Sequence, residues 1–138
     1  NLRPNLISGG NNNPTSGVAG GCAGAGARAG RSLSTPEIWY DPCQFALSEL
    51  GYYGNLGANT LTSPGLASFD FSILKDFNVT ENSRIQFRAE YFNFLNRPNF
   101  DSPETNVFEG GPPNPEAGKI TETNTSAREI QFGLRFIF

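Results

Sequence analysis

The residue types that carry most enzyme chemistry are scarce in this sequence. It contains no histidine, so it lacks the commonest general base and every nucleophile pair that depends on an imidazole. Four carboxylates in loop-like sequence could act as acids: Asp41, Glu49, Asp101 and Glu104. They form no paired motif, and carboxylates scattered in loops are usually solvated side chains. We therefore predict no catalytic residues and no enzymatic activity.

Two cysteines, Cys22 and Cys43, are the other reactive side chains. Two thiolates alone are too few ligands for structural zinc, so we predict neither a metal site nor a cofactor. In an oxidising compartment they could close a loop of about twenty residues, worth roughly 3 kcal/mol by loop entropy. The alternative is two free thiols. The strand pattern of the chain indicates an extracytoplasmic setting, and this setting favours the disulfide.

A glycine- and alanine-rich run from Gly17 to Gly30 superficially resembles a phosphate-binding loop. Its spacing, G-x-G-x-x-x-G over Gly24, Gly26 and Gly30, does not match the nucleotide-binding fingerprints, and no Lys-Ser/Thr pair follows. We interpret this run as a flexible low-complexity loop. The net charge of -3, from 10 basic and 13 acidic residues, also gives no electrostatic reason to expect nucleic acid as a partner.

The end of the chain, R-E-I-Q-F-G-L-R-F-I-F (128–138), alternates apolar with mostly polar or small residues. A period of two predicts a β-strand. Residues 67–77 and 84–96 alternate in the same way and are joined by a short polar turn, which predicts a hairpin. Lys75 and Asn93 each interrupt the apolar side of their strand, and continued alternation places Phe94 on the opposite side.

Two environments are compatible with such strands. In a soluble sandwich the apolar face is buried, whereas in an outer-membrane barrel it meets lipid and the polar face meets a wet lumen. The terminal strand alone slightly favours the soluble fold. The polar sides, however, hold charges such as Asp70, Arg88, Glu90 and Arg135, which are hard to place in a dry core.

The loop lengths also favour the barrel. The first two strands are joined by a short turn, and long connections fall at the opposite end, as in outer-membrane barrels with short periplasmic turns and long extracellular loops. We therefore predict an all-β fold of antiparallel strands, the C-terminal portion of an outer-membrane-type barrel with long Gly/Pro/Asn-rich loops. The expected parts are a loop-rich, low-complexity extracellular segment over 1–66 and, within 67–138, strands at about 67–77, 84–96 and 128–138 with a long loop over 97–127. The residues expected to face lipid are Phe69, Phe71, Ile73, Ile85, Phe87, Tyr91, Ile130, Phe132, Leu134 and Phe136.

Four aromatic residues outside these strands, Trp39, Tyr40, Tyr52 and Tyr53, have two interpretations. They could pack beneath a long loop, which is the commoner situation, or they could form a cluster that contacts a ligand or a membrane interface.

Five segments taken in order resemble a known family: I-W-Y-D-P-C-Q-F (38–45), G-N-L-G-A-N-T-L-T-S-P-G (54–65), F-D-F-S-I-L-K-D-F-N-V-T-E (69–81), R-I-Q-F-R-A-E-Y-F-N-F-L-N-R-P-N-F (84–100) and R-E-I-Q-F-G-L-R-F-I-F (128–138). They resemble the late part of TonB-dependent outer-membrane receptors, most closely the subgroup with an N-terminal carboxypeptidase-regulatory-like domain. The resemblance implies a 22-stranded barrel with an internal plug, which takes up scarce ligands with energy passed from the inner membrane. It identifies no ligand-binding residue here. Phe138 looks like the terminal aromatic by which such barrels are recognised for assembly.

Three strands cannot close a barrel, whose smallest single-chain form has eight. We therefore expect outer-membrane lipid, the remaining barrel strands and the barrel-assembly machinery as partners, in the cell outer membrane of a Gram-negative bacterium. The alternative is a released β-rich fragment, located outside the cell, whose open strand edges pair with other copies of itself into a fibre or a multi-chain barrel.

Overall fold

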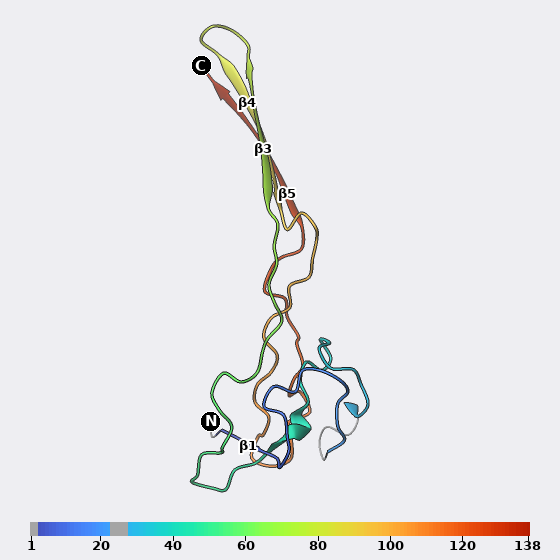
Figure 1. The fold of residues 1–138 in the computed structure, drawn as a ribbon. Helices are drawn as coiled ribbons and strands as arrows, with labels where there is room; N and C mark the ends of the chain where they lie inside the picture. The colour runs from blue at the N-terminus through green and yellow to red at the C-terminus, as the bar shows by residue number, and fades with distance from the viewer. Residues whose placement is uncertain (1–2, 23–27) are drawn as a thin grey trace. The chain divides into compact units, whose positions relative to one another are not determined.

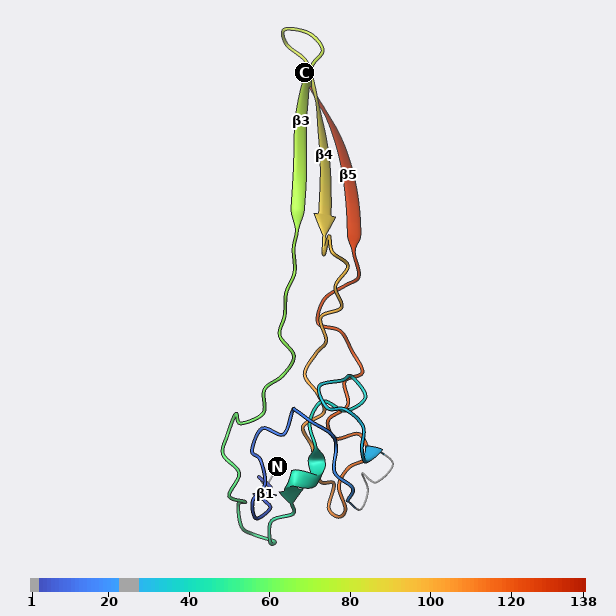
Figure 2. The ribbon, with the colours of Figure 1, turned by 45° about the vertical axis from the view of Figure 1, so that its right-hand side comes forward.

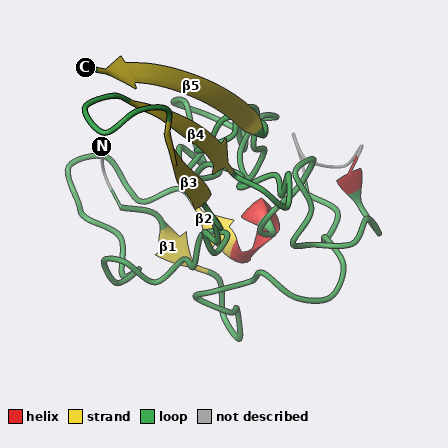
Figure 3. Cartoon of the chain, turned by 90° about the horizontal axis from the view of Figure 1, so that it is seen from above, coloured by secondary structure: helices red, strands yellow, loops and turns green. Residues whose placement is uncertain are grey.

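The computed structural model describes residues 3–22 and 28–138, and the chain divides into two compact units. One unit combines Asn1–Pro64 with Asp101–Glu122, and the other combines Gly65–Phe100 with Thr123–Phe138. Strands, turns and irregular backbone make up both units, with almost no helix in the described part of the chain (Figure 3). The predicted all-β, antiparallel fold class is confirmed.

The second unit is a three-stranded antiparallel sheet of β3 (Phe71–Asn78), β4 (Arg84–Phe92) and β5 (Glu129–Ile137), in that order (Figures 1 and 2). Alternating apolar residues, many of them aromatic or β-branched, favour extended backbone in these segments. The short turn 79–83 joins β3 to β4 at one end of the sheet. The long connection 93–128 joins β4 to β5 at the other end.

The register of the sheet places residues of similar chemistry side by side. One row across the three strands consists of Ile73, Ala89 and Phe132. Residues directly opposite each other in an antiparallel pair share a face, and successive residues along a strand alternate between faces. The three alternating patterns are therefore in phase, so the sheet has one apolar face and one mostly polar face.

All three strands are shorter than the sequence predicts, and β5 loses one residue at each end. β3 begins at Phe71 instead of residue 67, and β4 ends at Phe92 instead of residue 96. The backbone of Asn93 and of Asn96 is left-handed, with φ of 47° and 51°. Asparagine adopts this conformation more readily than most residues because its short polar side chain can hydrogen-bond locally. The left-handed backbone at Asn93 ends the extended run of β4.

The left-handed turn also changes the side of the sheet on which Phe94 lies. Continued alternation would place Phe94 opposite the apolar residues of β4, as the sequence predicts. Instead, the ring centroid of Phe94 lies 5.8 Å from those of Phe71 and Tyr91, which belong to the apolar face. The prediction for Phe94 is wrong because it assumed that alternation continues through Asn93.

The first unit is held by short elements and loop packing. It contains β1 (Asn5–Leu6), the 3-10 turn η2 (Pro42–Gln44) and β2 (Phe45–Ala46), and β1 pairs with β2. Tyr40, Phe45 and Val107 form a buried cluster at its centre. Val107 belongs to residues 101–122, so part of the long 97–127 loop packs with the N-terminal segment rather than standing alone. Gly24 and Gly26 of the glycine-rich run lie outside the described residues.

A close backbone approach explains one glycine in this packing. The Trp39 amide donates to the carbonyl of Gly118 at 2.6 Å. Gly118 has a φ of +80°, and a Cβ there would lie 2.9 Å from the carbonyl oxygen of Tyr40. Only glycine meets both conditions without strain. Gly118 thereby lets residues 101–122 approach the backbone on either side of Tyr40.

Candidate functional site

The largest surface feature of the sheet is an exposed apolar face. On the edge strand β5, Phe132 is 68% exposed and Leu134 is 74% exposed. Phe71 and Ile73 on β3 are also exposed. We define the apolar face by the residues that the register aligns on this side: Phe71, Ile73, Lys75 and Phe77 of β3, Ile85, Phe87, Ala89 and Tyr91 of β4, and Ile130, Phe132, Leu134 and Phe136 of β5. A contiguous face of this kind marks a surface that contacts another apolar phase or protein.

Nine of the ten residues predicted to face lipid belong to this set. The tenth, Phe69, precedes β3, and its carbonyl accepts a hydrogen bond from the Phe94 amide at 2.8 Å. The ring centroids of Phe69 and Phe94 are 6.3 Å apart, and Phe94 in turn packs against Phe71 and Tyr91 of the apolar face. Sequence alternation thus brought these residues to one side of the sheet.

The opposite face, the polar face, carries charged and amide side chains that bond to one another. Gln86 donates to the Asp76 carboxylate at 3.0 Å, between adjacent strands. Arg88 and Glu90, two residues apart on β4, form an ion pair at 2.5 Å. The face is not wholly polar, because Leu74, Phe92 and Ile137 share its rows. Its polar groups are partly exposed, which is compatible with contact with water.

Aromatic residues gather at both ends of the apolar face. At the end near the long connection, Phe71 stacks on Tyr91 with ring centroids 5.2 Å apart, and Phe94 packs edge-on against both rings. At the end near the short turn, the rings of Phe136 and Phe138 lie 5.7 Å apart. Phe138 itself is 94% exposed. Between these ends the rings of Phe87 and Phe132 stack with centroids 6.1 Å apart, so aromatic residues run along the whole face.

Two buried asparagines fasten the chain segments just beyond the sheet. Asn93 donates from Nδ2 to the carbonyls of Arg97 and Ser126, both at 3.0 Å. Asn99, which is 1% exposed, donates to the Thr125 hydroxyl at 2.9 Å and accepts from the Ala67 amide at 2.9 Å. These bonds tie the exit of β4 to the entries of β5 and β3. Sequence reasoning missed this role, although Asn93 was visible as an interruption of the apolar pattern.

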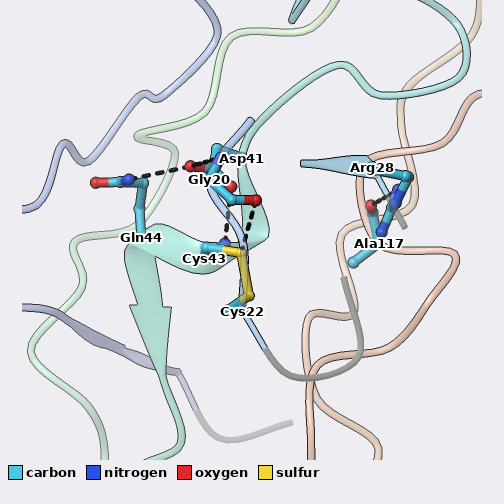
Figure 4. Close-up of a disulfide and its surroundings, with 7 residues drawn as sticks. All are labelled: Gly20, Cys22, Arg28, Asp41, Cys43, Gln44 and Ala117. Atoms are coloured by element: carbon cyan, nitrogen blue, oxygen red, sulfur yellow. Dashed lines mark hydrogen bonds between the residues drawn. A yellow bond between two sulfur atoms is a disulfide. The ribbon is translucent and has the colours of Figure 1, made fainter. Parts of the chain in front are cut away.

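In the first unit, Cys22 and Cys43 form a disulfide with an S–S distance of 2.06 Å (Figure 4). Asp41 lies beside it and is buried. The Asp41 carboxylate accepts hydrogen bonds from the amides of Gly20 and Cys43, both at 3.0 Å, and from the Gln44 side chain at 3.1 Å. Asp41 therefore caps η2 and holds both cysteine-bearing segments, which is a structural role.

The other candidate acids are not assembled into a reaction centre. Glu49 is exposed, whereas Asp101 and Glu104 line an open hollow of about 460 Å³ together with Glu116, Lys119 and Glu122. The Lys119 ammonium pairs with Glu116 at 2.7 Å. Within residues 3–22 and 28–138, no group of three or more histidine, cysteine, aspartate or glutamate side chains is arranged to hold a metal ion.

The aromatic residues Trp39, Tyr40, Tyr52 and Tyr53 do not form one cluster. Tyr40 is fully buried, and its hydroxyl donates to the Glu104 carbonyl at 2.8 Å. Burial, followed by the Glu104 charge, raises the pKa of the Tyr40 phenol above its usual range. The Trp39 indole donates to the Thr62 carbonyl at 2.6 Å. Tyr52 and Tyr53 are exposed. Tyr40 and Trp39 thus act in packing, and only the tyrosine pair is available at the surface.

Comparison with known proteins places the chain in a family. The model of a family described as an outer membrane beta barrel domain matches residues 3–131, which is nearly the whole chain. Neither a curated protein nor a solved structure matches the sequence. None of the helices in the described part of the chain has the length and apolarity that crossing a membrane would take.

Proposed function

We propose, because this chain belongs to the outer membrane beta barrel domain family, that it forms the final strands and extracellular loops of a TonB-dependent receptor that takes up ligands. Outer-membrane localisation follows from the family. The receptor function and its energy coupling are the part of the proposal that goes beyond the family. The single observation that carries the proposal is the exposed apolar face of the β3–β4–β5 sheet.

That face is best explained by lipid. Aromatic rings occur along the whole face and Lys75 is its one charged residue, and outer-membrane barrels carry an outward-facing apolar band with aromatic residues at its edges. Phe69 and Phe77 are eight residues apart, which at about 3.3 Å per residue and a tilt near 40° gives a height of roughly 20 Å. This height fits within the apolar band of about 25 Å in such barrels. In water, the same face would be an aggregation site.

The polar face supports a wet interior on the other side of the sheet. The Arg88–Glu90 pair and the Gln86–Asp76 hydrogen bond are partly exposed, and a solvated lumen removes the cost of burying such groups. Gly133 lies opposite Arg88, and a Cβ added at Gly133 would lie 3.8 Å from the Arg88 Cβ, so the glycine leaves space beside the Arg88 side chain. The sheet therefore separates two environments in the manner of a barrel wall.

The receptor assignment draws on the resemblance of residues 38–65, 69–100 and 128–138 to TonB-dependent receptors, and on the loops. The first unit is cross-linked and packed, as suits a loop body exposed outside the cell. Phe138 is the aromatic residue that the same resemblance proposes for recognition by the assembly machinery. Lipid and the remaining barrel strands are the other proposed partners. The class of ligand that the receptor takes up can be identified by measuring the growth of a strain that lacks the receptor on siderophores, vitamins and glycans.

The test of the lipid-facing surface uses neighbouring residues of β5. Phe132→Arg places a charge in the middle of the apolar face, where arginine costs about 2–4 kcal/mol in a barrel. Gln131→Arg places the same residue on the polar face and serves as the matched control. We expect Phe132→Arg to reduce the amount of heat-modifiable protein in the outer-membrane fraction, and Gln131→Arg to leave it near wild type. Equal insertion of the two variants would overturn the proposal.

A further inference from the structure

Lys75 is the one charged residue among those that define the apolar face. The register aligns it with Phe87 on β4, and Phe87 with Leu134 on β5. The rows before and after this one are wholly apolar: Ile73, Ala89 and Phe132 on one side, and Phe77, Ile85 and Phe136 on the other. Among the described residues that define this face, Lys75 is the one ionisable at neutral pH, and its side chain is exposed.

The Lys75 ammonium has no carboxylate partner within the described part of the chain. The ion pairs found there join Arg88 to Glu90 and Lys119 to Glu116. The neighbouring acid Asp76 projects to the polar face, because it is adjacent to Lys75 along the strand. Nζ of Lys75 lies 6.0 Å from the ring centroid of Phe77, which offers at most a cation–π attraction. No carboxylate among the described residues neutralises Lys75, so an anion bound there would come from outside them.

The position of Lys75 defines where such an anion would be. Phe77 lies two residues nearer to the end of β3, which corresponds to roughly 5 Å of height in a tilted strand. The ammonium approaches the Phe77 ring, and lysine side chains can lay their methylenes along apolar surface while the charge reaches the membrane interface. At that level a bilayer presents the phosphates of its lipid headgroups.

We propose that Lys75 binds the phosphate of a phospholipid whose acyl chains cover the adjacent apolar rows, on the side of the sheet that carries the short turn. The inference rests on the proposed membrane-barrel function. A phosphodiester supplies the missing negative charge, which lysine binds as a point charge. Its two acyl chains supply the apolar contact that Phe87, Leu134 and Phe136 offer. A free phosphate ion supplies only the first of these.

The test compares the two lysines of the sequence, Lys75 and Lys119. The complete barrel protein is reconstituted in nanodiscs that contain phosphatidylglycerol, and retained lipid is counted by native mass spectrometry after release. We expect Lys75→Gln to lower retention of phosphatidylglycerol about fivefold, the size of one lysine contact with an anionic surface. Lys75→Arg should retain it. Lys119→Gln, which alters a lysine of the first unit, should leave it unchanged.

Two further arms separate the sources of the phosphate. Diacylglycerol, which lacks a phosphate, should be retained equally by wild type and Lys75→Gln. Millimolar inorganic phosphate should not displace phosphatidylglycerol. Equal retention of phosphatidylglycerol by wild type and Lys75→Gln would overturn the inference, and so would displacement by inorganic phosphate. If the wild type itself fails to insert, as judged by absence of heat-modifiable mobility, the proposed function fails instead.

Discussion

A single buried phenol shows how much the first unit depends on individual hydrogen bonds. Tyr40 has no exposed surface, and its hydroxyl satisfies the Glu104 carbonyl. Burial is the main reason that its pKa is raised, with the Glu104 charge as the second cause. The folded unit therefore holds a proton that the unfolded chain releases above about pH 10, the ordinary pKa of tyrosine.

This raised pKa predicts a loss of stability at alkaline pH. The contribution of Tyr40 is complete below about pH 10 and is lost as the pH rises through the raised folded pKa. Tyr40→Phe should destabilise the unit by about 1 kcal/mol at neutral pH, through loss of one hydrogen bond, and should flatten the alkaline decline. Urea titrations followed by the fluorescence of Trp39, the one tryptophan, measure both effects.

The matched control for this measurement is Tyr53→Phe, because Tyr53 is 78% exposed. Tyr53→Phe should keep the wild-type unfolding midpoint at neutral pH and the wild-type decline at alkaline pH. An alkaline decline that is the same in Tyr40→Phe as in wild type would show that other groups cause it.

The sequence predicted the structural roles of some residues and missed the roles of others. The pairing of Cys22 with Cys43 and the common face of Phe71, Phe87 and Phe132 were expected from spacing and alternation. The roles of Asn93 and Asn99 were not expected, because apart from Arg97 the partners named for them lie 23 to 33 residues away in sequence. Hydrogen bonds between distant segments leave no local periodicity that a sequence pattern could reveal.

At the scale of elements, the three long strands were predictable and their ends were not. Alternation over many residues is a strong signal because each side chain contributes to it. The end of β4 depends on the left-handed backbone of Asn93. One residue in that conformation changes the side of the sheet on which the next side chains lie. The short strands β1 and β2 have two residues each and carry no pattern at all.

The disulfide gives an element-scale prediction for the first unit. Cys22 and Cys43 are separated by 21 residues in sequence, and removing a cross-link that closes such a loop costs about 3 kcal/mol in the chain-entropy model. The double variant Cys22→Ser with Cys43→Ser should therefore lower the urea midpoint of the Trp39 transition. The heat-modifiable mobility of the barrel should stay unchanged, because the disulfide lies within the first unit. An unchanged Trp39 transition would contradict the prediction.

At the scale of the whole molecule, the sequence predicted a loop-rich segment followed by strands, and the structure divides the chain differently. Residues 101–122 pack with the N-terminal segment, so each unit is assembled from two stretches of chain. The contacts responsible include Val107 against Tyr40 and Phe45, and the Arg28 guanidinium donating to the Ala117 carbonyl at 2.7 Å. Composition marks both stretches as loops, but it does not indicate which loops pack together.

The sheet also has consequences for assembly. Within the described chain, β4 is paired on both edges, whereas β3 and β5 are each paired on one edge. An open strand edge is a template for pairing with another strand, and the apolar face adds a second reason to associate in water. In the proposed receptor, both edges are completed by the remaining strands of the barrel.

The 138-residue chain by itself is therefore expected not to be a stable monomer. Refolded alone in detergent, it should form concentration-dependent oligomers by analytical ultracentrifugation and show no heat-modifiable monomer on gels. Co-refolding with the remaining strands of a barrel should suppress the oligomers, because the same edges are then occupied. Regular filaments under the electron microscope, unaffected by those strands, would instead support the self-assembling alternative. A discrete, heat-resistant monomer would contradict both, since three strands cannot close a barrel on their own.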